Sequence, residues 1–513
     1  MNKTLTMLER LGDPAVALTH GVGLKVYPRS VHPCGEGVVF LGRRDGRLAL
    51  GYLGTGEPPA GLTLLPVADG SGRLEGRLWL GDTSHANALA VRQLLPWAAP
   101  VTGGLRLSAG LGDRLGVATP GHVRAIRAAG SFFPIYAQQS IREMERTHRT
   151  PDDVMDDATW GVLQEGWTDG YGADADHLKT AADIDLCAAA GFVFYTLDPR
   201  EHVDPLADTD DLATLRAKYD ELPWKRLETS PDANRARYAG LQVTLGGGLA
   251  LEIDEEQALR AACKYGRAVA HLAGLSQHLA AVMGERPYEL EISVDETDTP
   301  TTTQEHYYIA SELKRLGVSW VSLAPRYVGR FEKGVDYIGD LAEFEREFAR
   351  HVAVAQALGP YKLSLHSGSD KFSIYPIAAR LAGTLVHLKT AGTSYLEGLR
   401  AVAQVEPSLF RRVLAFAVGH YDTERASYHV SADMAQVPDW RDLPDEALPA
   451  LLDDFHARQA LHVTFGLVLT GRTEGGDYLF REAIYAVLAG DEEAHYQALS
   501  RHFARHLTPF VSA

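Results

Sequence analysis

The sequence predicts an α/β protein built on a (β/α)8 TIM-like barrel, with an N-terminal β-rich domain and a C-terminal helical extension. Three observations lead to this prediction. Short alternating runs and many turns fill the first 107 residues, strand, loop and helix units alternate from residue 108, and the last 70 or so residues have a helical pattern. The predicted domains are therefore residues 1–107, 108–440 and 441–513. An open doubly wound sheet is the alternative, but no GxGxxG motif follows any predicted strand.

In the first domain, short apolar runs at 37–42 and 47–53 are separated by turn signals at 44–46 and 69–72. From residue 108 onward, period-two patterns and short apolar runs predict eight strands. They cover residues 113–119, 173–179, 192–197, 288–294, 319–324, 361–366, 385–389 and 426–430. The segment 304–317 has threonines as N-caps, an apolar side and Gly317 as a stop, which predicts a helix. Residues 492–507 carry apolar side chains at the spacing of one helix face.

Composition limits the class of protein. The chain has 513 residues, 45% hydrophobic and 23% charged, which is ordinary for a soluble globular protein. A net charge of −17 argues against nucleic acid as a partner, because phosphate binding needs a basic surface. No apolar run is long enough to span a membrane, and the N-terminus lacks a secretory apolar region. Three widely spaced cysteines form no CxxC motif, so we expect a reducing cytoplasm.

The segment from Lys362 to Pro376 carries the strongest chemical signal. Lys362, Ser364 and His366 alternate with leucines, as in a strand with one apolar face that ends in an imidazole. Side chains able to bind an oxyanion follow in the next turn: Ser367, Ser369, Asp370 and Lys371. Barrel enzymes build their active sites at such carboxyl ends of strands. A structural histidine at the end of an ordinary strand is the alternative.

Applying the alternation rule to the other strands places more polar side chains inside the barrel. His177 with Lys179, His387 with Lys389, and Glu289 with Glu291 are predicted to point inward. Imidazoles and carboxylates at one barrel mouth suit a borderline divalent metal, so His177 and His366 are candidate ligands. Structural ion pairs are the alternative for Glu289, Lys179 and Lys389.

The loop at 324–336 follows another predicted strand at the same end of the barrel. It offers Arg326, Arg330 and Lys333 for binding a carboxylate, and Glu332 as a further metal ligand. A solvated basic loop is the alternative. The acidic cluster at 295–300 is either a group of ligands and bases or the N-terminus of a helix, where aspartates are common.

Several blocks together resemble the tagaturonate epimerase family. They lie at 112–122, 172–179, 294–298, 330–334 and 365–376, and the last is the most specific. The resemblance runs from about residue 108 to the C-terminus. It implies a metal-dependent barrel enzyme that interconverts D-tagaturonate and D-fructuronate in hexuronate catabolism. It also implies roles for individual residues: Asp176 and Glu291 as proton acceptor and donor, and His177, Glu332 and His366 as metal ligands.

The implied reaction inverts a carbon that lies beta to a ketone, so deprotonation next to the carbonyl cannot achieve it. Our hypothesis is a retro-aldol cleavage followed by re-addition of the aldehyde from its other face, with the metal polarising the ketone. The acid end of the substrate would be held by a cation: Lys179, Arg326, Lys371 or Lys389.

Three alternatives remain: transient oxidation by a nicotinamide, a metal-dependent sugar-acid lyase or aldolase, and a non-catalytic carbohydrate-binding protein. The predicted ligands accept zinc, nickel, manganese or iron, and the sequence carries no signal for the oligomeric state.

Overall fold

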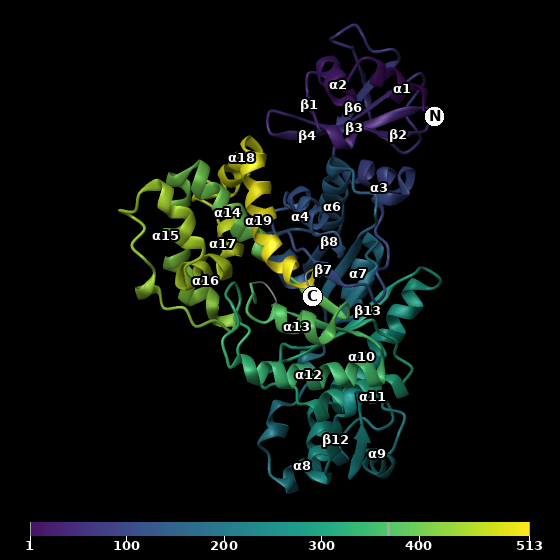
Figure 1. The fold of residues 1–513 in the computed structure, drawn as a ribbon, viewed down its shortest axis with the longest axis vertical. Helices are drawn as coiled ribbons and strands as arrows, with labels where there is room; N and C mark the ends of the chain where they lie inside the picture. The colour runs from purple at the N-terminus through teal and green to yellow at the C-terminus, as the bar shows by residue number, and fades with distance from the viewer. Residues whose placement is uncertain (1, 367–369, 391, 512–513) are drawn as a thin grey trace.

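The computed structural model describes residues 2–366, 370–390 and 392–511. Its centre is a closed barrel of eight parallel strands, which confirms the predicted fold class (Figure 1). In chain order the barrel strands are β7 (Ser108–Gly110), β8 (Phe133–Ser140), β9 (Gly172–Leu178), β10 (Phe194–Leu197), β13 (Glu289–Val294), β14 (Ser322–Pro325), β15 (Lys362–Leu365) and β16 (Val386–Lys389). Because all eight run in the same direction, their carboxyl ends meet at one mouth.

Six of the eight predicted strands overlap barrel strands, and two were wrong. Residues 113–119 form a turn held by Asp113, whose carboxylate accepts the backbone N–H groups of Leu115, Gly116 and Ala118. Residues 426–430 follow helix α15 (Pro407–Glu424) and pair with no strand. β7 and β8 take their places in the barrel. β7 is only three small residues long and β8 is buried on both faces, so neither shows an alternating pattern.

Helices alternate with the barrel strands, and many begin at a clear cap. Capping boxes start α5 (Ile141–Thr147), α6 (Pro151–Glu165), α7 (Ala181–Ala190), α10 (Glu255–Met283) and α11 (Thr303–Arg315). The predicted helix at 304–317 is confirmed as α11. The remaining helices of this layer are α4 (Thr119–Ala129), α12 (Leu341–Leu358), α13 (Tyr375–Ala382) and α14 (Thr393–Val405).

The N-terminal part is a twisted antiparallel sheet that lies beyond one side of the barrel (Figure 1). Its elements are α1 (Lys3–Arg10), α2 (Pro14–Val22), β1 (Lys25–Val26), β2 (His32–Cys34), β3 (Gly37–Arg44), β4 (Arg47–Gly54), β5 (Leu65–Val67), β6 (Arg77–Asp82) and α3 (His85–Leu94). Trp160 and Leu163 of α6 join its hydrophobic core, so the barrel layer and the sheet pack directly together.

Two further groups of elements surround the barrel. An insertion between β10 and α10 contains α8 (Leu212–Asp220), α9 (Pro231–Tyr238) and the hairpin of β11 (Leu241–Thr244) and β12 (Ala250–Ile253). On the other side, α14 and α15 pack with α16 (Phe455–Val463), α17 (Phe465–Thr470) and α18 (Arg481–Gly490) around a separate hydrophobic core. The domain boundaries at residues 107 and 440 stay predictions.

The last helix, α19 (Glu492–Val511), lies between this helical group and the barrel (Figure 1). It covers the segment 492–507 that the sequence predicts as a helix. Tyr496, Leu499 and Phe503 join the barrel core, which is why their spacing marks one face. Among the described helices, none combines the length and apolar character needed to cross a membrane.

Candidate active site

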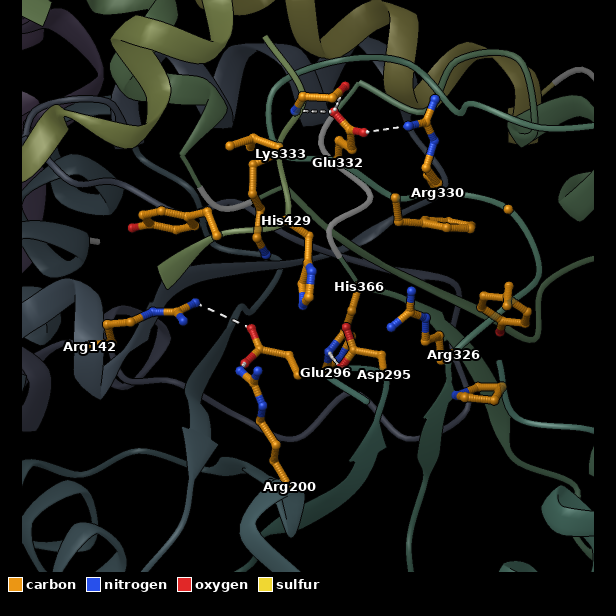
Figure 2. Close-up of a pocket in the computed structure, with 17 residues that line it drawn as sticks. Arg142, Arg200, Asp295, Glu296, Arg326, Arg330, Glu332, Lys333, His366 and His429 are labelled. Atoms are coloured by element: carbon orange, nitrogen blue, oxygen red, sulfur yellow. Dashed lines mark hydrogen bonds and ion pairs between the residues drawn. The ribbon is translucent and has the colours of Figure 1, made fainter. Parts of the chain in front are cut away.

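A cavity of about 300 Å³ opens where barrel strands end, and charged side chains line it (Figure 2). His366 from the end of β15 and Asp295 from the end of β13 lie on its floor. A second, smaller cavity adjoins it, because both are lined by Arg142, Lys333, His366 and Tyr428. The smaller one reaches Asp176 and His177 of β9.

The two histidines predicted as metal ligands lie next to each other. The ring centroids of His177 and His366 are 5.1 Å apart. Together with Asp295 they offer three donor atoms that all lie within 4.8 Å of one another. Asp198, Glu296 and His177 form a second such group beside the first. The donors of either group are close enough to bind one cation.

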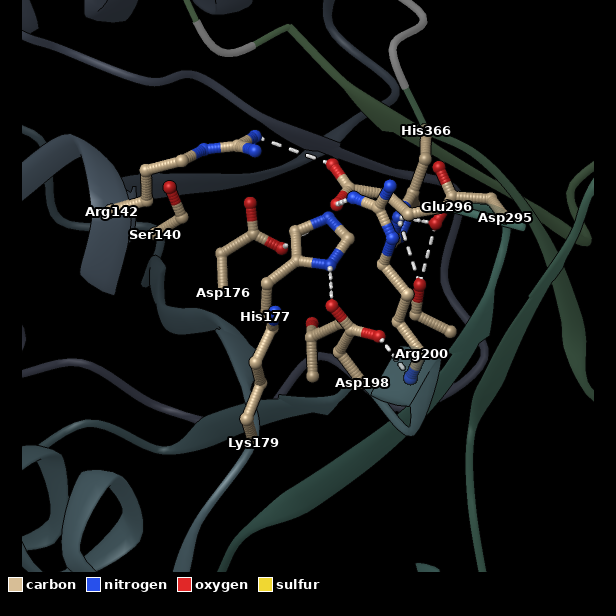
Figure 3. A network of polar contacts seen from close by, with 12 residues as sticks. Ser140, Arg142, Asp176, His177, Lys179, Asp198, Arg200, Asp295, Glu296 and His366 are labelled. Atoms are coloured by element: carbon tan, nitrogen blue, oxygen red, sulfur yellow. Dashed lines mark hydrogen bonds and ion pairs between the residues drawn. The ribbon is translucent and has the colours of Figure 1, made fainter. Parts of the chain in front are cut away.

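The backbone of β9 explains how neighbouring residues reach the same mouth. His177 has a left-handed conformation, with φ of 54°, and the pairing of β9 with β10 shifts register at this point. Asp174 and Asp176 both point into the barrel toward Lys389. The change of backbone at His177 brings that side chain next to Asp176 at the end of the strand (Figure 3). The alternation rule placed His177 correctly but was wrong for Asp176 and Lys179, because it assumed an uninterrupted extended backbone.

Lys389 of β16 is the centre of a buried network inside the barrel. Its Nζ atom lies 2.9 Å from Asp174, 2.7 Å from Asp176 and 2.9 Å from Glu291. The lysine and the three carboxylates are all buried. Its ammonium group thus neutralises part of a dense negative charge, and it holds Asp176 at the edge of the smaller cavity.

His366 is fixed by carboxylates on both sides of its ring. Its Nε2 atom lies 2.5 Å from Glu291, and its Nδ1 atom lies 3.1 Å from Asp295. Burial favours the neutral ring, but Asp295 and then Glu291 outweigh that effect and raise the pKa of His366 to about 9. Burial also favours the neutral ring of His177. The carboxylates of Asp176 and Asp198 outweigh this effect and raise the pKa of His177 to about 10.

Three carboxylates of the site, those of Asp176, Glu291 and Asp295, stay ionised for the complementary reason, whereas burial raises the pKa of Asp174 to about 7. Burial disfavours the charge of Asp176, but Lys389 and then His177 hold its pKa well below the usual range. Burial also raises the pKa of Glu291 and of Asp295. At Glu291 the positive charges of Lys389 and His366 outweigh burial and lower the pKa, and at Asp295 the charge of His366 does the same. At neutral pH the site is therefore a set of charged acids and cationic groups in a buried setting.

Of the other predicted site residues, some line the cavities at the mouth and some do not. Arg326 lines the main cavity. Lys179 points to Glu201, 3.3 Å away, and lines neither cavity of the mouth. Lys371 donates to the backbone carbonyl of Glu332 at 2.8 Å. The side chain of Glu332 lines the cavity, but it accepts bonds from Ser431 and Gln459 and is not brought together with His177 and His366.

Several functional candidates escaped the sequence analysis. Arg142 of α5 and Arg200 of a 3₁₀ turn lie on either side of Glu296, at 3.3 and 3.2 Å (Figure 2). Asp198 follows β10 directly, so its position at a strand end was the available signal. No local pattern marks Arg142 or Arg200, because only the tertiary fold brings them to the mouth. Ser367 and Ser369, predicted to bind an oxyanion, lie outside the described residues.

Comparison with known sequences extends this picture to the whole chain. A sequence model of the tagaturonate epimerase family matches residues 27–510. The chain belongs to the tagaturonate epimerase family. A curated relative, the tagaturonate/fructuronate epimerase of Thermotoga maritima, is 41% identical over 490 residues, which are 95% of this chain and 97% of the relative. Family membership confirms the predicted resemblance and makes the protein an isomerase that acts on sugar acids.

Solved structures of the family give the same fold. Native and glycerol-bound crystal structures of the fructuronate-tagaturonate epimerase from Cohnella laeviribosi match with a TM-score of 0.89. They are 38% identical in sequence and cover 99% of both chains. The barrel, the N-terminal sheet and the C-terminal helices are thus features of the family.

Proposed function

We propose that this protein is a metal-dependent epimerase that interconverts D-tagaturonate and D-fructuronate at the barrel mouth. The relatives named above carry this activity in their names. The observation that carries the proposal is the convergence of His177, Asp295 and His366 beside a cavity lined by arginines. Imidazole and carboxylate are the donors that borderline divalent cations accept.

His177, Asp295 and His366 would hold the cation, and its binding would release a proton from each imidazole, because only the neutral ring is a metal ligand. Buried polar atoms support this assignment: His177 Nδ1 and Asp198 Oδ2 form an ion pair at 3.4 Å, but neither atom has a hydrogen bond within the described part of the chain. When bound, a divalent cation would supply Lewis acidity that polarises the ketone of the substrate. We place Glu332 in the cavity wall, where Ser431 and Gln459 hold its carboxylate.

Arg326 is the best candidate to bind the carboxylate of the sugar acid. Its guanidinium makes no hydrogen bond or ion pair within the described part of the chain, and the side chain points into the cavity (Figure 2). By contrast, Arg142 and Arg200 already share Glu296. A planar guanidinium can bind a carboxylate through two parallel hydrogen bonds.

Asp176 is the candidate base. It is ionised, it borders the smaller cavity, and Lys389 and Gln138 fix its carboxylate at 2.7 and 3.0 Å. Glu291, the predicted proton donor, lines neither cavity of the mouth. It acts on the cavity through His366, which it contacts directly. A proton moved between substrate and protein would therefore pass by way of Asp176.

The step that inverts the carbon is a reversible cleavage of a carbon–carbon bond. Asp176 removes the proton from the hydroxyl on the carbon beta to the ketone. That oxygen forms a carbonyl, the adjacent carbon–carbon bond breaks, and the electron pair moves to the ketone to give an enolate. The aldehyde fragment turns over, the enolate attacks its other face, and the proton returns to the new hydroxyl. The hydrogen on the inverted carbon stays in place throughout.

The activity is tested by stripping the protein of metal, reloading it with one cation at a time and adding D-tagaturonate. NMR should show D-fructuronate with at least one of zinc, nickel, manganese or iron, and no conversion after chelation. His366→Ala should abolish both conversion and stoichiometric metal binding, while the circular dichroism spectrum stays close to that of the wild type. Full activity of the chelated protein would refute metal dependence.

The route is tested by running the reaction in deuterated water. Retro-aldol chemistry leaves the hydrogen of the inverted carbon in place, so the product should contain no deuterium there. Deuterium at that carbon would rule the route out. Accumulation of the two fragments in place of the epimer would instead indicate a lyase.

A further inference from the structure

A second group of buried charges lies away from the cavity, where the chain after β15 meets the C-terminal helices. Its members come from four segments of the chain and are all buried except Arg400, which is partly buried: Asp370, Glu397 and Arg400 of α14, Arg458 of α16, and His502 of α19. Charged groups are rarely fully buried unless they are paired, and these side chains pair with one another.

Asp370 is the residue on which the group converges. Arg458 Nε lies 3.0 Å from its Oδ2 atom, and His502 Nε2 lies 2.7 Å from its Oδ1 atom. Its backbone N–H donates to His506 Nε2 at 3.1 Å. Asp370 also adopts a left-handed backbone, with φ of 66°, which is uncommon for a residue other than glycine. Side chains from two helices thus hold this strained position.

The same atoms argue against a second metal site. Asp370, His502 and His506 have donor atoms within 4.8 Å of one another, as in a metal centre. However, the lone pair of His506 Nε2 already accepts the backbone N–H of Asp370. The guanidinium of Arg458 occupies the other carboxylate oxygen, and a cation next to it would be repelled. The arrangement is an ion-pair network.

Lys371 connects this network to the cavity. It follows Asp370 in the chain, and its Nζ atom donates to the carbonyls of Glu332 and Val335, at 2.8 and 2.5 Å. Those carbonyls belong to the loop after β14, which places Glu332 and Lys333 in the cavity wall. A displacement of Asp370 would therefore move Lys371 and the wall it holds.

We propose that Asp370 and His502 are positioning residues, through which α19 sets the shape of the substrate cavity. The effect runs from His502 to Asp370, then through Lys371 to the loop at 332–335. Neither Asp370 nor His502 lines the cavity at the mouth. The kinetic part of this proposal rests on the proposed function, whereas its structural part does not.

The first test compares Asp370→Asn, His502→Leu and His502→Gln in the metal-loaded, full-length protein. For Asp370→Asn and His502→Leu, kcat/KM with D-tagaturonate should fall by about tenfold to a hundredfold, mainly through a higher KM. Metal content should stay at the wild-type value, because the contacts of Asp370 and His502 described above do not involve the candidate ligands His177, Asp295 and His366. His502→Gln should recover most of the activity, since its amide can still donate to Asp370.

Glu493→Gln is the matched control. Glu493 is also on α19, but its carboxylate pairs with Arg124 at an exposed position, 2.8 Å away. This variant removes one charge from the same helix and should leave KM unchanged. If it raised KM as much as His502→Leu, the effect would be a general loosening of α19 and the proposal would fail.

The second test does not depend on catalysis. Hydrogen–deuterium exchange should become faster in peptides covering 330–336 and 370–375 in Asp370→Asn and His502→Leu, and stay unchanged in Glu493→Gln. Unchanged exchange in both network variants would overturn the proposal even if activity were lost. If the wild type failed to convert D-tagaturonate, the proposed function would fail while exchange still tested the positioning role. If Asp370→Asn does not fold, the kinetics and the exchange of the two His502 variants test the proposal instead.

Discussion

The left-handed backbone of one residue, His177, determines which side chains meet at the candidate site. His177 at φ of 54° lets Asp176 and His177 serve the same barrel mouth, which an extended strand cannot do with adjacent residues. Asp176 thereby meets Lys389, and His177 meets His366. A left-handed conformation at a histidine is energetically unfavourable, so its occurrence beside the cavity fits a functional position.

Arg326 provides a prediction about substrate charge. Arg326→Met should raise KM for D-tagaturonate about tenfold to a hundredfold, because a charged hydrogen bond to the carboxylate contributes about 1.5–3 kcal/mol. KM for the neutral ketose D-tagatose should be unchanged, because this sugar has no carboxylate. Steady-state kinetics with both sugars measures the ratio, and an equal loss for the two would show that Arg326 does not bind the carboxylate.

Lys389 provides a prediction about stability. Lys389→Met leaves Asp174, Asp176 and Glu291 buried together without their shared cation, so the free energy of unfolding should drop by about 3–5 kcal/mol. Adding Asp174→Asn removes one of these charges and should restore part of the loss. Urea unfolding of the single and double variants checks this, and additive losses would contradict the shared network.

Part of the site could be predicted from the sequence for a physical reason. Glu291 and Lys389 lie on regular strands and His366 directly follows one, so alternation predicts the direction of each side chain. Asp176 came only from the family resemblance, because local pattern does not reveal the left-handed backbone at His177. Arg142 and Arg200 could not be predicted at all, since a helix and a 3₁₀ turn bring them to the mouth through tertiary packing.

At the scale of elements, some barrel strands could be predicted from the sequence and others could not. β13 and β15 have one apolar face and were predicted, whereas β8 is buried along its full length and carries a proline. β7 consists of three small residues whose strand character depends on its neighbours β8 and β16. Patterns identify an element when its two faces differ, and these two elements have no such difference.

The packing of α4 against α14 and α19 predicts sensitivity to acid. His122 of α4 is fully buried, contacts Ser394 at 2.7 Å and packs on Phe503, and burial lowers its pKa to about 3. Between pH 6.5 and about 3 the unfolded chain binds a proton that the folded protein does not. Stability from this group is therefore complete above pH 6.5 and is lost as the pH falls below it, by about 1 kcal/mol per pH unit.

The variant His122→Gln keeps a polar partner for Ser394 but cannot titrate. Its urea midpoint at neutral pH should be somewhat lower than that of the wild type, and the difference should shrink as the pH is lowered toward 4. Parallel pH profiles for the two proteins would show that His122 does not contribute to the acid sensitivity.

At the scale of the whole molecule, one carboxylate connects the N-terminal sheet to the last helix. Glu492 at the start of α19 accepts a hydrogen bond from Tyr27 at 2.6 Å and pairs with Arg43 at 3.0 Å. Both partners belong to the N-terminal part of the chain, so this contact holds the sheet against the barrel layer from outside the core.

Glu492→Gln should loosen the sheet without changing catalysis. A charged hydrogen bond of this kind contributes about 1.5–3 kcal/mol, so limited proteolysis should release N-terminal fragments faster than from the wild type. KM and kcat with D-tagaturonate should be unchanged, because Glu492 lies outside the mouth cavities. Unaltered cleavage would mean that the apolar contacts with Trp160 and Leu163 hold the sheet alone.

The course of α19 also bears on how the protein is made. Its first turn contacts Tyr27 and Arg43, and its third carries the His502 that holds Asp370. All three partners are translated long before residues 492–502 leave the ribosome. A nascent chain can therefore close its barrel early, yet the tethering of its amino-terminal sheet and the fixing of the loop beside the cavity must wait for the same late segment.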